Sequence, residues 1–229
     1  MKSTLASAGV KPSTTPGTVS DSVRRTQMML ACGVAAGPLF IVVALIQAAT
    51  RTGFDPAKHP ASLLSVGDLG WIQIANFVLC GLLYLASAFG MRSALRSGRA
   101  AVWGPRLIGA FGVALVAGGV LVADPGLGFP PGTPEGIPAT MSWHGMLHAV
   151  APVVGFLALS LACFVFARRS FGRAERGWAV FSIGTGVVIQ VLGAIPNANM
   201  NFIPLWAAMV LGFGWASAQA ARLVARPSR

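Results

Sequence analysis

Two of the three histidines in the chain lie four residues apart, in the stretch TMSWHGMLH over residues 140–148. Side chains at positions i and i+4 of a helix share one face, with Cβ atoms about 6 Å apart. His144 and His148 therefore have the spacing of two ligands of one metal ion, as in H-E-x-x-H helices. The intervening residues are Gly, Met and Leu, so the glutamate of that motif is absent.

A carboxylate from a neighbouring helix would complete such a site. Asp124 ends the apolar run before the histidines, and two histidines, one carboxylate and an open position for water are typical of hydrolytic zinc sites. The candidate metal site is thus Asp124, His144 and His148, with His59 of an earlier loop as a less favoured ligand. The cofactor stays unknown from the sequence, with a divalent ion such as zinc as the candidate.

Other roles for the histidines stay open. His144 follows Trp143, which suits an aromatic belt at a membrane interface, and His148 could hydrogen-bond a polar group to steady helix packing. A proton relay or the recognition of a carboxylate is a further alternative. We do not expect haem, because two histidines one turn apart point the same way and cannot hold one iron from opposite faces. Ser142 is the expected N-cap of their helix.

The elements that carry these residues are membrane helices. The chain has 229 residues, of which 55% are hydrophobic and 10% charged, with a mean hydropathy of +0.70. A membrane-spanning helix needs about 20 apolar residues, and a turn at residues 195–204, with two prolines and three asparagines, divides the last long run. We predict an all-α integral membrane protein, a bundle of six spans at about residues 26–49, 69–91, 106–123, 142–167, 177–195 and 202–222.

The basic residues predict the orientation of the chain. Of 17 Lys and Arg residues, only Arg51 and Lys58 fall on one side of these six spans, which leaves 15 on the other. The positive-inside rule then places both termini in the cytoplasm, with the protein multi-pass in the cytoplasmic (inner) membrane. Residues 1–25 are expected to form a disordered tail, residues 26–223 the membrane domain and residues 224–229 a short basic tail.

The distribution of Lys and Arg residues also indicates which partners to expect. The formal net charge is +11, but the charges mark orientation and form no basic stripe interleaved with aromatic residues, so we expect no nucleic acid. Membrane lipids are the expected partners. Protein partners and the oligomeric state remain unknown from the sequence.

Polar residues gather in the exterior half of the predicted bundle. Polar groups at membrane depth face the bundle interior or a wet cavity and mark functional sites by default. We therefore expect an outward-opening pocket beneath an ordered Pro- and Gly-rich loop that precedes the histidines. Its candidate residues are Asp68, Gln73, Asn76, Asp124, His144, His148 and Gln190.

Two functions suit such a pocket. One is a metal-dependent hydrolase that acts on a lipid or lipid-linked substrate. The alternative is a non-catalytic module that binds a lipid, a small ligand or a partner protein, with structural histidines. A transporter ranks third, because the inner half offers no polar path. Whether the protein is an enzyme stays open.

The order of three motifs suggests a family. They are TGFDPAKHPASLLSVGDLGWIQIANFVLCGLLYL, an Asp-Pro that ends the third span, and HGMLH at the start of the fourth. In this order the chain resembles the prokaryotic membrane proteins catalogued as domain of unknown function 998, over about Met28 to Leu223. The resemblance implies a bacterial six-helix membrane protein and no particular activity.

A looser likeness is to membrane hydrolases that include the alkaline ceramidases. These combine an aspartate, two histidines four apart and a further histidine on a seven-span bundle, which Asp124, His144 and His148 match in part. The later spans of this chain hold no further histidine.

Overall fold

The structure is a computed structural model that describes residues 16–194 and 200–225. These residues form six α-helices and one short 3-10 helix, η1. Five of the helices, α1 to α5, are long and apolar enough to cross a membrane. The elements are α1 (Pro16–Thr50), η1 (Ala61–Ser65), α2 (Gly70–Ala94), α3 (Arg99–Val120), α4 (Trp143–Phe171), α5 (Arg176–Ala194) and α7 (Ile203–Val224).

The helices extend past the boundaries that hydropathy predicts. Helix α1 begins at Pro16 and so includes residues 16–25, which hydropathy assigns to the disordered tail, and α3 begins at Arg99 rather than at residue 106. Residues 18–32 contain no Pro and no Gly. No helix-breaking residue therefore separates residues 18–25 from the apolar run that follows, and the helix includes both. Residues 1–15, 195–199 and 226–229, with parts of the predicted tails and turn, lie outside the described residues.

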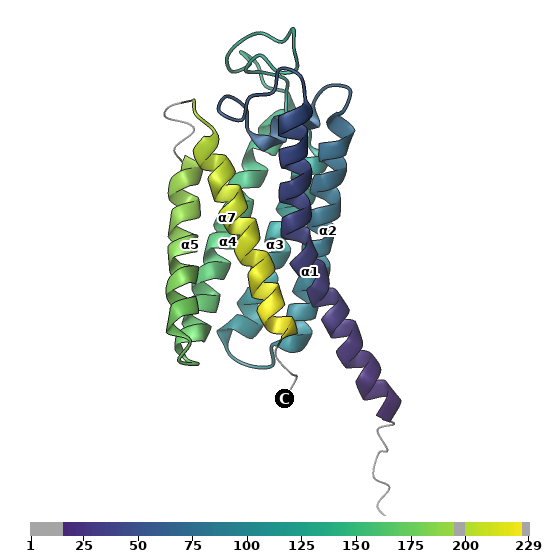
Figure 1. Cartoon of the computed structure of the whole chain (residues 1–229), viewed down its shortest axis with the longest axis vertical. Coiled ribbons are helices and arrows are strands. Elements are labelled where there is room, and N and C mark those ends of the chain that lie inside the picture. The colour runs from purple at the N-terminus through teal and green to yellow at the C-terminus, as the bar shows by residue number, and fades with distance from the viewer. Residues whose placement is uncertain (1–15, 195–199, 226–229) are drawn as a thin grey trace, which may run out of the picture.

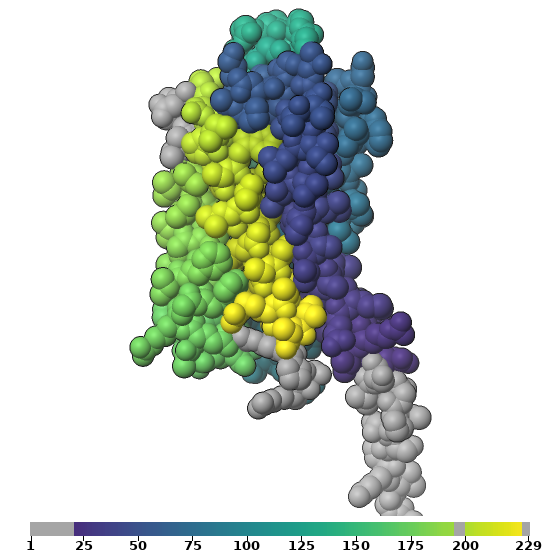
Figure 2. All heavy atoms as spheres, in the orientation of Figure 1, coloured from purple at the N-terminus to yellow at the C-terminus, as the bar shows by residue number. Residues whose placement is uncertain are grey.

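The six helices form a closed ring. Neighbours pack in the order α1, α2, α3, α4, α5 and α7, and α7 returns to pack against α1. The chain runs up and down, so α1 begins and α7 ends at the same end of the bundle (Figure 1). We call this the basic end. The opposite end is the capped end, because residues 51–69 and 121–142 fold over it (Figure 2).

A hydroxyl group of α7 closes the ring against α1. Ser217 donates to the carbonyl of Gly33 at 2.9 Å and accepts from the N–H of Gly37 at 3.1 Å. In a regular helix the N–H of Gly37 would bond to the carbonyl of Gly33. The Ser217 hydroxyl therefore inserts between two backbone groups that are usual hydrogen-bond partners in α1. The approach needs glycine, because a Cβ at position 37 would contact the Ser217 Oγ and lie 2.6 Å from the carbonyl oxygen of Phe213.

Four aromatic rings fill the middle of the ring. Phe40 lies 4.5 Å from Phe213, and Phe111 lies 5.1 Å from Phe213 and 5.0 Å from Tyr84, between ring centroids. All four side chains are buried. We call these four rings the aromatic plug.

His59 holds the loops of the capped end together. Its Nδ1 accepts from the Asp55 N–H at 2.9 Å, and its Nε2 lies 2.9 Å from the Leu127 carbonyl. Its own carbonyl accepts from the Trp206 indole at 3.0 Å. The ring thus joins both loops of the capped end, and its backbone is bonded to the first turns of α7. The first of these loops contains the short helix η1, whose Leu63, Leu64 and Ser65 are buried.

The α1–α7 contact predicts a difference between two glycines. Gly37→Ala should lower the free energy of unfolding by about 1–3 kcal/mol, because overpacking displaces the α7 backbone. Gly184→Ala on α5 is the matched control, since a Cβ there has no neighbour within 4 Å. Thermal unfolding in detergent measures both. Equal midpoints for the two variants would contradict the described close approach.

Candidate functional site

A cavity of about 110 Å³ lies inside the capped half of the ring. Its roof is the turn that leads into η1, and its floor is the aromatic plug, through Phe40, Phe111 and Phe213. Helices α3, α4 and α7 supply most of the wall. All lining side chains are apolar except those of Ser62 and His148 and the indole N–H of Trp206, which is bonded to His59.

The cavity opens on its side rather than at its floor. Pro152 of α4 lines it and is exposed, and Phe156 of α4 and Leu205 of α7 line it and are half-buried. No residue of α5 contributes to the wall, and α4 and α7 barely touch. Within the described residues, the exposed and half-buried residues of the rim therefore lie on α4 and α7, the two helices that pack on either side of α5.

The orientation of His148 follows from its backbone partner. Its Nδ1 lies 2.6 Å from the carbonyl oxygen of Leu121, the C-cap of α3. A carbonyl oxygen only accepts hydrogen bonds, so Nδ1 carries the proton. In the neutral imidazole, Nε2 then keeps a lone pair as an acceptor. The ring is buried, 6% exposed, and so brings one acceptor to a wall whose other polar side chains are Ser62 and the bonded indole of Trp206.

His144 makes the same kind of contact one turn earlier. Its Nδ1 lies 2.8 Å from the carbonyl oxygen of Val122. The carbonyls of Leu121 and Val122 follow the end of α3, where the helix has no further N–H to offer. The i, i+4 spacing of the histidines thus matches two successive carbonyl groups of a neighbouring segment.

Asp124 binds the first residue before α4 rather than the histidines. Its carboxylate accepts from the Ser142 hydroxyl at 2.6 Å and from the Ser142 N–H at 2.8 Å. The Ser142 hydroxyl in turn accepts from the Gly145 N–H at 3.0 Å, which confirms Ser142 as the N-cap of α4. A Cβ at Gly145 would contact the carboxylate, so this glycine allows the approach.

These bonds favour the charged form of Asp124. The hydrogen bond from the Ser142 hydroxyl, above all, lowers the pKa of the carboxyl group against a smaller opposing effect of burial. The Ser142 N–H and the nearby imidazoles of His144 and His148 lower the pKa further. The carboxylate is therefore an ionised anchor for the start of α4.

The predicted metal ligands are near one another but do not form a cluster. Within residues 16–194 and 200–225, no group of three His, Cys, Asp or Glu side chains is placed to hold a metal ion. Asp124 is engaged by Ser142, and both ring nitrogens of His59 are engaged by backbone groups. The hydrogen bonds identified for His144 and His148 involve Nδ1, and the backbone of Gly118 is a further partner of the His148 ring.

The other predicted pocket residues lie elsewhere. Gln73 and Asn76 of α2 are buried against α1, where Gln47 donates to Gln73 at 2.8 Å and Asn76 donates to the Phe40 carbonyl at 3.1 Å. Asp68 is exposed after η1. Gln190 of α5 is exposed and donates to the Phe156 carbonyl at 2.9 Å. Of the seven predicted pocket residues, His148 alone lines the cavity.

Ser62 and Trp206 line the cavity without being predicted to do so. Ser62 lies in η1 between Ala61 and Leu63, and its sequence context carries no distinguishing signal. Trp206 lies near a helix end, where an interfacial tryptophan gives the same pattern.

Comparison with known proteins identifies a family. Residues 34–225 match the family described as "Protein of unknown function (DUF998)". The chain belongs to the DUF998 family. No curated protein and no solved structure matches it. The match covers every described helix, apart from the first part of α1, so the cavity and the histidines lie within the DUF998 region.

The Asp124–Ser142 contact predicts acid sensitivity of this DUF998 protein. Because the folded-state pKa of Asp124 is lowered, its stabilisation is full above the ordinary value of about 3.9 and is lost as pH falls through the lowered pKa. Asp124→Asn should cost about 1–3 kcal/mol at neutral pH. It should also flatten the loss of thermal stability between about pH 5 and pH 2.

A double-mutant cycle isolates this contact. Ser142→Ala should itself cost about 1–2 kcal/mol through loss of the cap, and in its presence Asp124→Asn should cost much less. Additive costs, with the same pH slope in wild type and in Asp124→Asn, would show that the two residues do not act together.

Proposed function

We propose that this protein is a membrane-embedded binding module for an amphiphile whose polar group is a hydrogen-bond donor. The observation that carries the proposal is the cavity, which is apolar except for one acceptor, the Nε2 atom of His148, and the hydroxyl of Ser62. Ligand sites of this kind combine an apolar wall with a few polar groups that fix orientation.

The size of the cavity limits what enters it. An engineered apolar cavity of about 150 Å³ stays dry and holds one benzene, so about 110 Å³ accommodates a group of several carbon atoms. A whole lipid does not fit. The donor-bearing end of an amphiphile does, with its remaining chain passing over Pro152 and Phe156 into the surrounding lipid.

The chemistry of His148 selects the ligand. Its Nδ1–H is committed to Leu121, so the neutral ring meets a ligand only as an acceptor. A hydroxyl or an amide N–H satisfies that acceptor, whereas a carboxylate or a phosphate would face a lone pair. The expected ligand class is therefore an alcohol or an amide with an apolar body.

Quenching of Trp206 fluorescence by a small brominated alcohol tests the proposal. Trp206 lines the cavity, so 4-bromobutan-1-ol should quench it saturably, and Trp206→Phe should remove the saturable fraction. At equal membrane partition, 1-bromobutane should bind about fivefold more weakly, because it lacks a hydrogen bond worth about 1 kcal/mol.

Two variants of α4 give a matched comparison. Ala151→Leu fills the cavity, which Ala151 lines, and should abolish saturable quenching. Ala149→Leu makes the same change at an exposed position outside the cavity and should leave it intact. Linear, equal quenching in wild type and in Ala151→Leu would overturn the binding proposal.

We further propose that all six helices span the cytoplasmic membrane, with both termini in the cytoplasm. Helix α7 has 22 residues, about 33 Å at 1.5 Å per residue, against a hydrocarbon core of about 30 Å. Its Ser217 and Gln219 lower its hydropathy but are buried and hydrogen-bonded within the bundle. Its exposed positions are apolar or glycine: Ile203, Ala207, Val210 and Gly214.

Fusions to a protein that fluoresces only in the cytoplasm test this orientation. A fusion after Arg229 and one after Phe171 should fluoresce, and one after Ala194 should stay dark. The positive-inside rule makes this prediction from the arginines of the basic end. A bright fusion after Ala194 would contradict it.

A metal-dependent hydrolase is the second candidate, and one observation favours it. Metal-binding histidines usually donate their other ring N–H to a carbonyl or carboxylate, and His144 and His148 both place Nδ1 against a carbonyl. Their Nε2 atoms would be the two protein ligands, and bound water would be the nucleophile for a lipid ester. Transport gains no support, because the aromatic plug closes the floor of the cavity.

Metal content of the purified protein tests this second candidate. Stoichiometric Zn, Mn or Fe in wild type, lost in His148→Ala and retained in the exposed control Asp68→Asn, would support it. A wild type that is folded, metal-free and unable to take up added zinc would exclude it and leave the binding module.

A further inference from the structure

The basic end carries a second hollow, a groove on the flank formed by the end of α4 and the facing side of α5. Its walls are apolar, from Phe164, Ala167 and Phe171 of α4 and Ile183 of α5. Arg168 is the only charged residue that lines it. Phe164, Arg168 and Phe171 stand at i, i+4 and i+7, so the guanidinium lies on the same helix face as the two exposed rings.

We propose that this groove binds an anionic phospholipid of the adjacent leaflet, with its phosphate at Arg168 and an acyl chain along Phe164 and Ile183. A planar guanidinium matches a phosphate in two parallel hydrogen bonds. The apolar part of the groove continues directly from this charge along the lipid-facing flank.

The depth of Arg168 suits a phosphate. It lies 25 residues after Trp143, the first residue of α4, which is about 38 Å at 1.5 Å per residue. A bilayer with its headgroups is about 40–45 Å thick. With Trp143 in the opposite interface, Arg168 reaches the headgroup level, and the rings of the groove reach the hydrocarbon.

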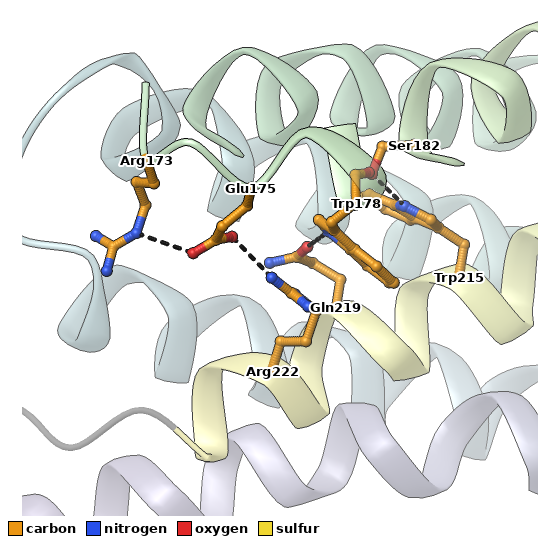
Figure 3. Close-up of polar contacts among 7 residues, drawn as sticks. All are labelled: Arg173, Glu175, Trp178, Ser182, Trp215, Gln219 and Arg222. Carbon is orange, nitrogen blue, oxygen red and sulfur yellow. Dashed lines mark hydrogen bonds and ion pairs between the residues drawn. The ribbon is translucent and has the colours of Figure 1, made fainter. Parts of the chain in front are cut away.

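Among the described residues, no ion pair involves Arg168. Residues 168–176 carry four arginines and one acid, Glu175. Figure 3 shows that Glu175 lies between Arg173 and Arg222, and its carboxylate oxygens are 3.4 and 2.7 Å from these two guanidinium groups. Arg222 is further held over the Trp178 ring at 4.5 Å. The two ion pairs thus join Glu175 to Arg173 and to α7, and neither involves Arg168.

The charge also argues against a second copy of the chain as the occupant. Every copy carries its arginines at the same end, so two parallel copies would bring like charges together at this groove. An anionic headgroup removes that repulsion.

Lipid binding to the purified full-length protein tests the proposal. Phosphatidylglycerol and phosphatidylcholine with the same acyl chains are titrated in detergent, with native mass spectrometry as the readout. We expect phosphatidylglycerol to bind about tenfold more tightly, and Arg168→Gln to remove that preference, which corresponds to loss of one charge-assisted contact. Arg96→Gln removes an equally exposed charge at the same end and should retain it.

The other outcomes are decisive. Equal binding of the two lipids would overturn the proposed site. An equal loss of the phosphatidylglycerol preference in Arg168→Gln and Arg96→Gln would also overturn it, because it would show diffuse attraction to the basic end. Inorganic phosphate alone should neither bind nor compete at millimolar concentration. Competition by it as strong as that by phosphatidylglycerol would show a site for a free anion instead of a lipid.

Discussion

Two hydrogen bonds from imidazole rings to the end of α3 hold the site together. Lipid offers no partner to a bare carbonyl, and Leu121 and Val122 follow the last turn of a membrane helix. His148 and His144 donate to them from successive turns of α4. The two histidines four residues apart are therefore explained by the backbone geometry of a neighbouring segment, whether or not they also bind a metal.

The cavity depends on the same bonds. They fix which ring nitrogen of His148 carries a proton, and so give the apolar wall its acceptor. Asp124 and Ser142 set where α4 begins, while Ser217 holds α7 to α1 on the other side of the ring. Helices α4 and α7 make few direct contacts because α5 packs against both of them, and the cavity lies between the inner faces of α3, α4 and α7.

Hydropathy predicts most of the fold because a helix in contact with lipid needs a long run of apolar residues. It does not predict the extra turns at the start of α1 and α3, since a helix can continue into the headgroup region and beyond it. For the site, hydropathy gives the depth of a residue and not its direction around the helix axis. Gln73 and Asn76 lie at the predicted depth but face α1, whereas His148 faces the cavity, and the turn that brings Ser62 to its roof depends on long-range contacts of His59.

The protonation of the three histidine rings tests the central claim most directly. Nitrogen-15 NMR of histidine-labelled protein at neutral pH should show Nδ1–H rings with unprotonated Nε2 for His144 and His148. His59 is an internal reference, because its Nδ1 accepts from Asp55 and its Nε2 donates to Leu127, so it should show the opposite tautomer. Nε2–H rings at His144 and His148 would contradict the account, since neither ring could then donate to the end of α3 or present an acceptor to a ligand.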